Sequence, residues 1–297
     1  MTKRIMRGEL CALCAALVLM AACATQTATS SARLATGGDS AAEKLGWRLG
    51  TQSYTFRNVT FLEAVDKTAS LGLHYIEAFP NQKVGKERAD MKLAFTMPKE
   101  VRDAIKRKLK DAGVKMVNYG VITVKGEEQW RQLFDFAKDM GIETIVSEPR
   151  AEDFDLLDKL TEEYGINIAI HNHPKPSTYW NPDTVLEACK GHGKRIGACA
   201  DTGHWMRSGV NPIEALKKLE GRIVSLHLKD LNEFGDRKAH DVPWGTGKGD
   251  VKAMLAELRR QNFRGVFAIE YERLGENMMP EIAQCVAYFN RAVAQLL

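Results

Sequence analysis

Short apolar runs alternate with longer amphipathic stretches from about residue 47 to the end of the chain. The runs are rich in Val, Ile, Leu and Ala, and the stretches between them have apolar residues at helical spacing. We expect eight strands, at residues 49–56, 74–80, 114–121, 144–148, 167–173, 196–201, 223–229 and 266–272. Because eight parallel strands with helices between them close into a cylinder, the pattern predicts an α/β fold. That fold is a single-domain (β/α)8 TIM barrel over residues 46–297.

Several predicted helices have recognisable ends. Thr60-Phe-Leu-Glu63 is a capping box, and Asn-Pro pairs at 181–182 and 211–212 place a capping Asn before proline. Met97-Pro98 opens a helix that Gly113 ends. Two connections, 81–96 and 230–249, are long, and long strand-to-helix loops usually shape the active site of a barrel.

Four of the apolar runs finish with a side chain that binds metals: Glu148, Asp201, His227 and Glu270. An unpaired carboxylate or imidazole in a dry interior costs several kcal/mol, so something must satisfy these groups. A single divalent cation would serve them all, because carboxylate oxygens and imidazole nitrogen suit Mn, Mg, Co or Zn. We therefore expect one divalent metal ion as cofactor.

Period-two alternation indicates which strand residues point into the barrel. In 223–229 the outward set includes Val224, which leaves Ser225, His227 and Lys229 inward. The other strands place further polar residues inward near their carboxyl ends, namely Glu148, His171, His173, Glu270 and Glu272. Because these ends meet at one mouth, the side chains can converge.

The first residues are expected to be removed or to serve as a tether. Three basic residues precede an apolar stretch that ends at Met20-Ala-Ala-Cys23, so residues 1–23 look like a lipoprotein signal peptide with Cys23 as the lipidation site. Residues 24–45 are rich in Ser, Thr, Ala and Gly and are expected to be a flexible tether. The protein would then be periplasmic and held to the membrane only through its lipid anchor.

Charge and cysteine content exclude some classes. The formal charge is +4, of which about +2 remains without the leader, and no basic stripe supports nucleic-acid binding. Three cysteines remain after Cys23, at 189, 199 and 285, and three distant thiols make no disulfide framework. Self-association into a homo-oligomer stays open.

The segments Asp201-Thr-Gly-His-Trp205, His227-Leu-Lys-Asp230, Gly245-Thr-Gly247 and Ile269-Glu270 resemble the xylose-isomerase-like TIM barrel superfamily, which includes sugar phosphate isomerases and epimerases. The resemblance implies one divalent ion held by a glutamate, an aspartate, a histidine and a glutamate on successive strands. The last three match Asp201, His227 and Glu270. On the fifth strand His171 stands where the relatives carry glutamate, so either His171 or Glu148 is the first ligand.

The candidate roles follow from these placements. Glu148, His171 and Glu270 are the candidate acid/base residues, beside their roles as ligands. The candidates for substrate contact are Tyr54, Glu77, His173, His204, Trp205, Lys229 and His240. The Gly245-Thr-Gly-Lys-Gly249 run lacks the spacing of a phosphate loop and is interpreted as turn chemistry.

The leading functional hypothesis is a metal-dependent sugar isomerase or epimerase that abstracts a proton next to a keto group through a metal-stabilised enediolate. Sugar phosphates are cytoplasmic, so export favours a non-phosphorylated sugar or keto-sugar. A 3-keto-glycoside lyase is the runner-up. A non-catalytic carbohydrate-binding barrel is a weaker alternative, as is an endonuclease IV-like nuclease, whose extra early histidines this chain lacks, with only His74 before residue 171.

Overall fold

The computed structural model describes residues 41–276 and 278–297. The expected signal peptide, Cys23 and most of the expected tether lie outside these residues. Ala41–Lys44, which were expected to belong to the tether, form the helix α1, which contacts β1 and α10. Within the described part of the chain, no helix is both long and apolar enough to cross a bilayer.

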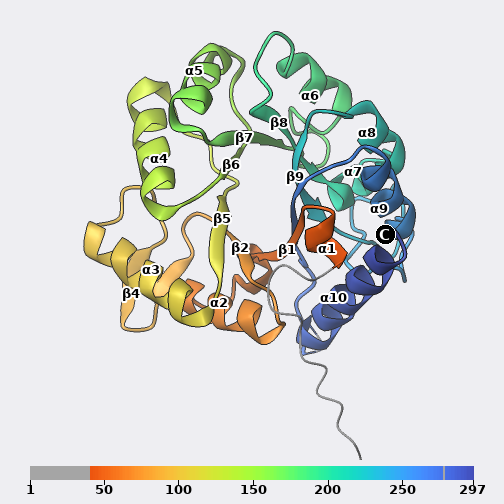
Figure 1. Ribbon diagram of the computed structural model, residues 1–297, viewed down its shortest axis with the longest axis horizontal. Coiled ribbons are helices and arrows are strands. Elements are labelled where there is room, and N and C mark those ends of the chain that lie inside the picture. Colours follow the sequence, from red (N-terminus) through yellow and green to blue (C-terminus); the bar gives the residue numbers. More distant parts are fainter. Residues whose placement is uncertain (1–40, 277) are drawn as a thin grey trace, which may run out of the picture. The chain divides into compact units, whose positions relative to one another are not determined.

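Eight parallel strands close into a barrel, as the sequence pattern predicts (Figure 1). Around the barrel they follow the order β1-β10-β9-β8-β7-β6-β5-β2. The strands are β1 (Trp47–Gln52), β2 (Tyr75–Ala78), β5 (Lys115–Tyr119), β6 (Thr144–Ser147), β7 (Asn167–His171), β8 (Ile196–Asp201), β9 (Ile223–Leu228) and β10 (Gly265–Ile269).

Helices surround the sheet and connect its strands (Figure 1). Thr60 forms the expected capping box, and Asn181 and Asn211 accept hydrogen bonds from the first amides of their helices. The helices are α2 (Phe61–Ser70), α3 (Lys99–Ala112), α4 (Gly126–Met140), α5 (Phe154–Tyr164), α6 (Pro182–Ala188), α7 (Thr202–Arg207), α8 (Pro212–Lys218), α9 (Val251–Arg260) and α10 (Met278–Ala294), with short 3-10 turns η1 (Ser53–Phe56) and η2 (Ala151–Asp153).

Most strands end earlier than their apolar patterns suggest. The chain leaves β1 at Gln52 and turns into η1, and Glu148, Lys229 and Glu270 each follow the last residue of their strand. Polar side chains are therefore carried on the first loop residues, at the mouth of the barrel.

One expected side-chain direction is wrong. Instead of facing the helices, Val224 packs against the small cluster inside the barrel formed by Val146, Ala169 and Cys199. The register of β8 and β9 shifts here, since Ala198 pairs with Ile223 while Cys199 pairs with Ser225. The extra residue in β9 is a β-bulge, which breaks the period-two rule locally.

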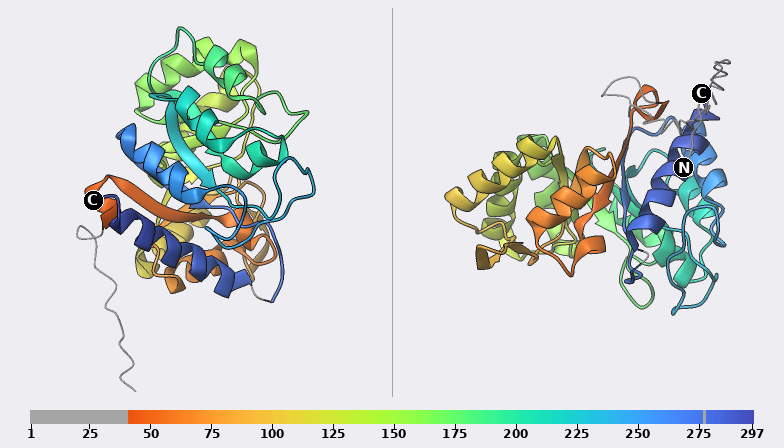
Figure 2. Two further views of the ribbon diagram at one scale, coloured as in Figure 1. Left: turned by 90° about the vertical axis from the view of Figure 1, so that its right-hand side faces the viewer. Right: turned by 90° about the horizontal axis from the view of Figure 1, so that it is seen from below.

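The two long connections have different structures. The first contains a hairpin of β3 (Lys83–Gly85) and β4 (Arg88–Lys92). In the second, the Asp230 carboxylate accepts hydrogen bonds from the amides of Gly245, Gly247 and Gly249 at 2.9–3.0 Å. These amides are occupied, which agrees with turn chemistry rather than a phosphate loop. This second loop lies at the opposite end of the barrel from α1 (Figure 2).

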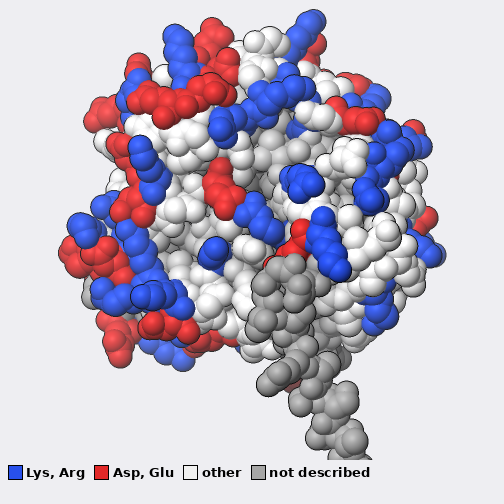
Figure 3. Space-filling model, in the orientation of Figure 1, with Lys and Arg blue, Asp and Glu red and all other residues white. Residues whose placement is uncertain are grey.

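The main core lies between sheet and helices, where the rings of Trp47, Phe267 and Phe289 meet at centroid distances of 4.9–6.2 Å. Acidic and basic side chains are interspersed over the face drawn in Figure 3, without a basic stripe. That face gives no support to a nucleic-acid interface.

Candidate metal centre and active site

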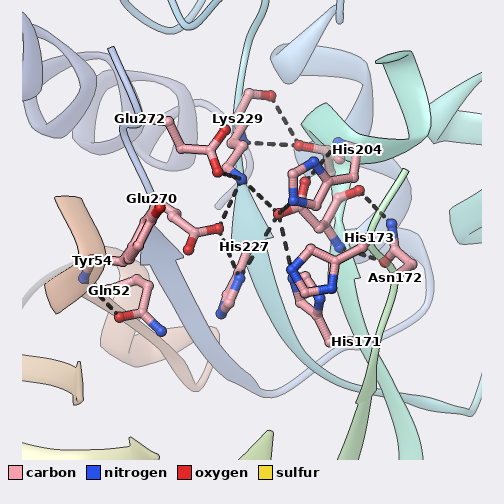
Figure 4. Close-up of polar contacts among 12 residues, drawn as sticks. Gln52, Tyr54, His171, Asn172, His173, His204, His227, Lys229, Glu270 and Glu272 are labelled. Carbon is pink, nitrogen blue, oxygen red and sulfur yellow. Dashed lines mark hydrogen bonds and ion pairs between the residues drawn. The ribbon is translucent and has the colours of Figure 1, made fainter. Parts of the chain in front are cut away.

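Four side chains from adjacent strands converge at the mouth of the barrel, and Figure 4 labels three of them, His171, His227 and Glu270. His171 ends β7, Asp201 ends β8, His227 lies in β9, and Glu270 follows β10. Each is buried and offers one ligand atom, and these atoms lie within 4.8 Å of one another. The convergence expected from the sequence is therefore present, with His171 rather than Glu148 as the fourth member.

His227 is oriented by a carboxylate behind it. Its Nε2 lies 2.8 Å from Glu77 Oε1, and because a carboxylate only accepts, Nε2 carries the proton. Nδ1 then faces Glu270 Oε2 at 3.1 Å and Asp201 Oδ2 at 3.8 Å. A carboxylate that fixes the far nitrogen of an imidazole is the usual support of a metal-binding histidine.

Asp201 uses its two oxygens for different tasks. Oδ1 caps α7 by accepting a hydrogen bond from the His204 amide at 2.7 Å. Oδ2 faces the centre, 3.6 Å from His171 Nε2. Burial raises the pKa of this carboxyl, but Lys229 and His171 nearby outweigh that effect and hold the pKa well below its usual range. Asp201 is thus ionised.

His171 has both ring nitrogens buried without a hydrogen-bond partner among the described residues. Nδ1 lies 3.7 Å from Glu148 Oε1, and Nε2 points at Asp201. An imidazole left in this way destabilises the folded protein, because each buried polar atom without a hydrogen bond costs about 1–3 kcal/mol. Glu148 stands behind His171 as Glu77 stands behind His227.

The four side chains fit a divalent cation. Three unpartnered nitrogens, two on His171 and Nδ1 of His227, lie beside two buried carboxylates. Imidazole and carboxylate together suit zinc, manganese or cobalt, and the set comes with its own orienting carboxylates. The cation would be held by His171, Asp201, His227 and Glu270.

Lys229 also reaches this cluster, from the end of β9, and is fully buried. Its Nζ lies 2.8 Å from Asp201 Oδ2, 2.7 Å from Glu270 Oε2 and 3.4 Å from Glu272 Oε1. Burial lowers the pKa of Lys229, but Asp201, Glu270 and Glu272 raise it well above its usual value overall. The side chain is therefore an ammonium ion, not an amine nucleophile.

Glu148 forms a separate pair with His173. Its Oε1 contacts His173 Nδ1, and Oε2 accepts a hydrogen bond from Ser177 Oγ at 3.1 Å. Burial raises the pKa of Glu148, but the neighbouring imidazoles of His171 and His173 lower it overall. An ionised carboxylate thus orients His173, whose ring lines the pocket.

His204 is held in one tautomer. Arg207 Nη1 donates to His204 Nδ1 at 3.1 Å, and since arginine only donates, Nε2 carries the hydrogen of a neutral ring. Burial lowers the pKa of His204 well below its usual value. Its Nε2 lies 3.7 Å from Asp201 Oδ2, so His204 presents an N–H donor beside the cluster.

A pocket of about 390 Å³ opens above these groups. One side is polar, with His173, His204, Glu270 and Glu272, and the other side contains Tyr54 and Phe79, whose rings meet edge to face at 5.2 Å. The lining residues are Gln52, Tyr54, Phe79, Pro80, Asn81, Gly120, Val121, His173, His204, Glu270 and Glu272.

Not every expected substrate contact lies at this pocket. Trp205 is fully buried in the core between sheet and helices, and His240 is exposed on the 230–249 loop. Glu77 and Lys229 are buried behind the pocket and act on the ligand groups instead. Tyr54, His173 and His204 do line the pocket.

Sequence reasoning missed two residues that shape the site. Gln52 Nε2 donates to Glu77 at 2.8 Å, and its place as a polar residue ending an apolar strand was a usable signal. Arg207 pairs with Glu272 at 2.5 Å besides orienting His204. Nothing in its helical spacing distinguishes Arg207 from a surface arginine.

Comparison with known proteins agrees with this fold. The family model described as "Xylose isomerase-like TIM barrel" matches residues 65–288. An inosose dehydratase of Clostridium beijerinckii is 26% identical over 161 residues, which are 50% of this chain and 48% of that protein. The chain thus spans about half the length of the curated relatives it matches.

Three solved structures share the fold. A putative uncharacterized protein of Parabacteroides distasonis is 34% identical with a TM-score of 0.68, covering 83% of this chain and 99% of that one. A D-tagatose 3-epimerase-like protein has 17% identity and a TM-score of 0.64, covering 84% and 100%. An IolI protein with a bound zinc atom has 18% identity and a TM-score of 0.62, covering 84% and 99%. Proteins of this kind thus carry dehydratase and epimerase names.

Proposed function

Because the chain belongs to the xylose isomerase-like TIM barrel family, we propose that it is a divalent-metal-dependent sugar isomerase or epimerase. It would remove a proton from the carbon next to the carbonyl group of an uncharged keto-sugar and return a proton to the substrate. The observation that carries the proposal is the convergence of His171, Asp201, His227 and Glu270 beside a pocket that is lined by two candidate proton-transfer groups, Glu270 and His173.

A divalent cation held by these four residues would supply Lewis acidity, which polarises a substrate carbonyl and acidifies the neighbouring C–H. The protein's own groups would bind the substrate and orient the candidate ligands. His204 Nε2–H is fixed by Arg207 and can donate a hydrogen bond to a substrate oxygen. Glu77 and Glu148 keep the two ligand histidines in place.

Two groups on different sides of the cluster can take and return the proton. In Figure 4, Glu270 and His173 flank the ring of His227, and both line the pocket. Glu270 is ionised, since Lys229 and His227 outweigh the effect of burial and lower its pKa. His173 is oriented by Glu148 in the manner of an acid/base histidine. A proton removed by one group and returned from the other gives inversion or isomerisation.

The pocket favours an uncharged substrate. Among its lining residues are two carboxylates, Glu270 and Glu272, and neither lysine nor arginine. A phosphate group there would meet like charge, and no lysine or arginine in the pocket lining would pair with it, which costs free energy at short range. A sugar ring has hydroxyls for the polar side and C–H faces for Tyr54 and Phe79.

Solvent exchange tests the proposal. The protein, loaded with Mn²⁺ and incubated with unphosphorylated ketoses in deuterated water, should introduce deuterium next to the carbonyl without bond cleavage. The Glu270→Gln variant should lose this exchange by at least about 10²-fold, as expected for an acid/base group. Absence of exchange with every keto-sugar offered would overturn the proposal.

Elimination is the second candidate, favoured by one observation. His204 is a fixed neutral donor distinct from Glu270 and His173, and elimination needs a donor for the departing oxygen. In this alternative a 3-keto-glycoside loses its aglycone, or a keto-polyol loses water. Release of an aglycone in the same incubation identifies elimination, and label without release identifies isomerisation.

We also propose that the chain is exported and lipid-modified at Cys23, which the leader pattern Met20-Ala-Ala-Cys23 supports. An uncharged substrate fits an exported enzyme. Labelling cells with a clickable fatty acid tests this directly: wild-type protein should take up label and Cys23→Ser should not.

A further inference from the structure

The Lys229 ammonium contacts the same carboxylate oxygens that face His171 and His227. Asp201 Oδ2 lies near His171 Nε2 and His227 Nδ1, and Glu270 Oε2 lies 3.1 Å from His227 Nδ1. The ammonium stands 2.8 and 2.7 Å from these two oxygens. A divalent cation and this ammonium would compete for them, because two positive charges on shared ligands repel strongly in a buried site.

The backbone of Lys229 is fixed, so only its side chain can respond. Lys229 N donates to Thr202 Oγ1 at 2.8 Å, and Thr202 Oγ1 donates to the Lys229 carbonyl at 2.9 Å. The aliphatic stem lies against Gly203, where an added Cβ would meet Lys229 Cδ at 2.7 Å. The ammonium sits at the end of a flexible four-carbon chain beyond this fixed backbone.

A third carboxylate is within reach. Glu272 Oε1 lies 3.4 Å from Lys229 Nζ, while Oε2 of the same residue pairs with Arg207. Unlike Asp201, Glu272 lines the pocket. A small rotation toward Glu272 would keep the ammonium paired and bring it to the pocket wall.

We propose that Lys229 is an exchangeable counter-ion, which neutralises Asp201 and Glu270 in the absence of metal and turns to Glu272 when a divalent cation binds. Lys229 stays protonated in both positions. The exchange couples the metal site to substrate binding, because a loaded site presents an N–H donor to the oxygens of a bound sugar. It rests on the proposed function in requiring that a cation binds the four ligands.

Titration calorimetry with Mn²⁺ at one fixed pH tests the exchange. Lys229→Met should bind Mn²⁺ about tenfold or more tightly, because no internal cation has to be displaced. Glu272→Gln should bind it several-fold more weakly, because the displaced ammonium loses its second partner. The exposed residues Lys248 and Glu233 provide matched charge controls, and Lys248→Met and Glu233→Gln should leave the affinity unchanged.

The double variant separates exchange from simple charge effects. If Lys229 moves to Glu272, the effect of Glu272→Gln on Mn²⁺ affinity should largely disappear in the Lys229→Met background. Fully additive effects, or a Lys229→Met protein with unchanged or weaker affinity, would overturn the inference. If Lys229→Met does not fold, the test rests on Glu272→Gln alone, and equal affinity to wild type would overturn it.

The same data separate this inference from the function proposed above. Absence of Mn²⁺ binding by the wild-type protein contradicts the metal-dependent function itself. Binding without coupling between Lys229 and Glu272 contradicts only the exchange.

Discussion

Glu77 Oε1 and His227 Nε2 lie 2.8 Å apart although 150 residues separate them along the chain. Gln52 and Asn118 donate to the same carboxylate, so Glu77 is held by donors from β1 and β5. This arrangement fixes which nitrogen of His227 faces the centre before any ligand arrives. Preorganisation of this kind raises metal affinity, because the ligand does not have to be ordered on binding.

Glu77→Gln should therefore weaken metal binding by about 10- to 100-fold, the range found for partners of this kind. The amide cannot hold the imidazole with the same charge, while its size is preserved. Calorimetric titration with Zn²⁺ or Mn²⁺ measures the change. The exposed Glu100→Gln variant is the control for loss of one negative charge, and a Glu77→Gln affinity equal to this control would contradict the role.

The Glu148–His173 pair should act as one unit in turnover. Glu148→Gln and His173→Gln are each expected to lower kcat by about 10²-fold, since both remove the oriented acid/base histidine. The double variant should be no worse than Glu148→Gln alone, because His173 has already lost its orienting partner in that variant. Steady-state kinetics with the substrate found in the exchange experiment would reveal additive losses if the two residues worked independently.

Gly203 should be intolerant of a side chain. Its missing Cβ leaves room for the Lys229 stem, which an alanine would meet at 2.7–2.8 Å. Gly203→Ala should lower the free energy of unfolding by about 1–3 kcal/mol through overpacking. Urea denaturation compares it with Gly275→Ala, where no neighbouring atom lies within 4 Å of the added Cβ and little change is expected. Similar stability of the two variants would show that the stem has room to move.

Asp241 should make stability depend on pH. Its Oδ2 accepts the Glu272 amide at 3.1 Å, but Oδ1 is buried without a hydrogen-bond partner among the described residues, and burial raises its pKa to about 7. The unfolded chain gives up this proton near pH 4, whereas the folded protein keeps it until about pH 7. The stabilising contribution is therefore complete below pH 4 and is lost as pH rises to about 7.

Asp241→Asn removes this pH-dependent contribution. Relative to wild type, its free energy of unfolding should rise by about 2–3 kcal/mol between pH 5 and pH 8, roughly 1.4 kcal/mol for each of two pH units. Urea denaturation at both pH values gives the difference. Parallel changes in the two proteins would mean that Asp241 is already ionised at pH 5.

The fold was predictable because each barrel strand is apolar over most of its length and each helix carries its own end signals. The eight strands and the caps at Thr60, Asn181 and Asn211 follow from local pattern alone. Strand ends were less accurate, since polar residues such as His173 and Glu272 continue the alternation beyond the last ladder hydrogen bond. Val224 was misplaced because a bulge depends on the partner strand, which one strand's sequence does not describe.

The candidate ligands were predictable because an ionisable residue at the end of a buried strand requires a partner of opposite charge. The sequence did not show which carboxylates face the candidate cation site and which lie on the far side of the histidines. Glu77 and Glu148 have the same chemistry as Glu270, and only the geometry shows that they approach the histidines from the far side. Trp205 follows His204 directly, yet the turn of α7 carries one side chain to the pocket and the other into the core.

Asp201 starts a helix with one oxygen and faces the cation site with the other. One carboxylate therefore serves both as a helix cap and as a candidate metal ligand, and its truncation to alanine would also loosen the segment that carries His204 and Arg207. Asparagine is the replacement that separates the two roles, because its amide oxygen can still accept the His204 N–H while the negative charge is gone.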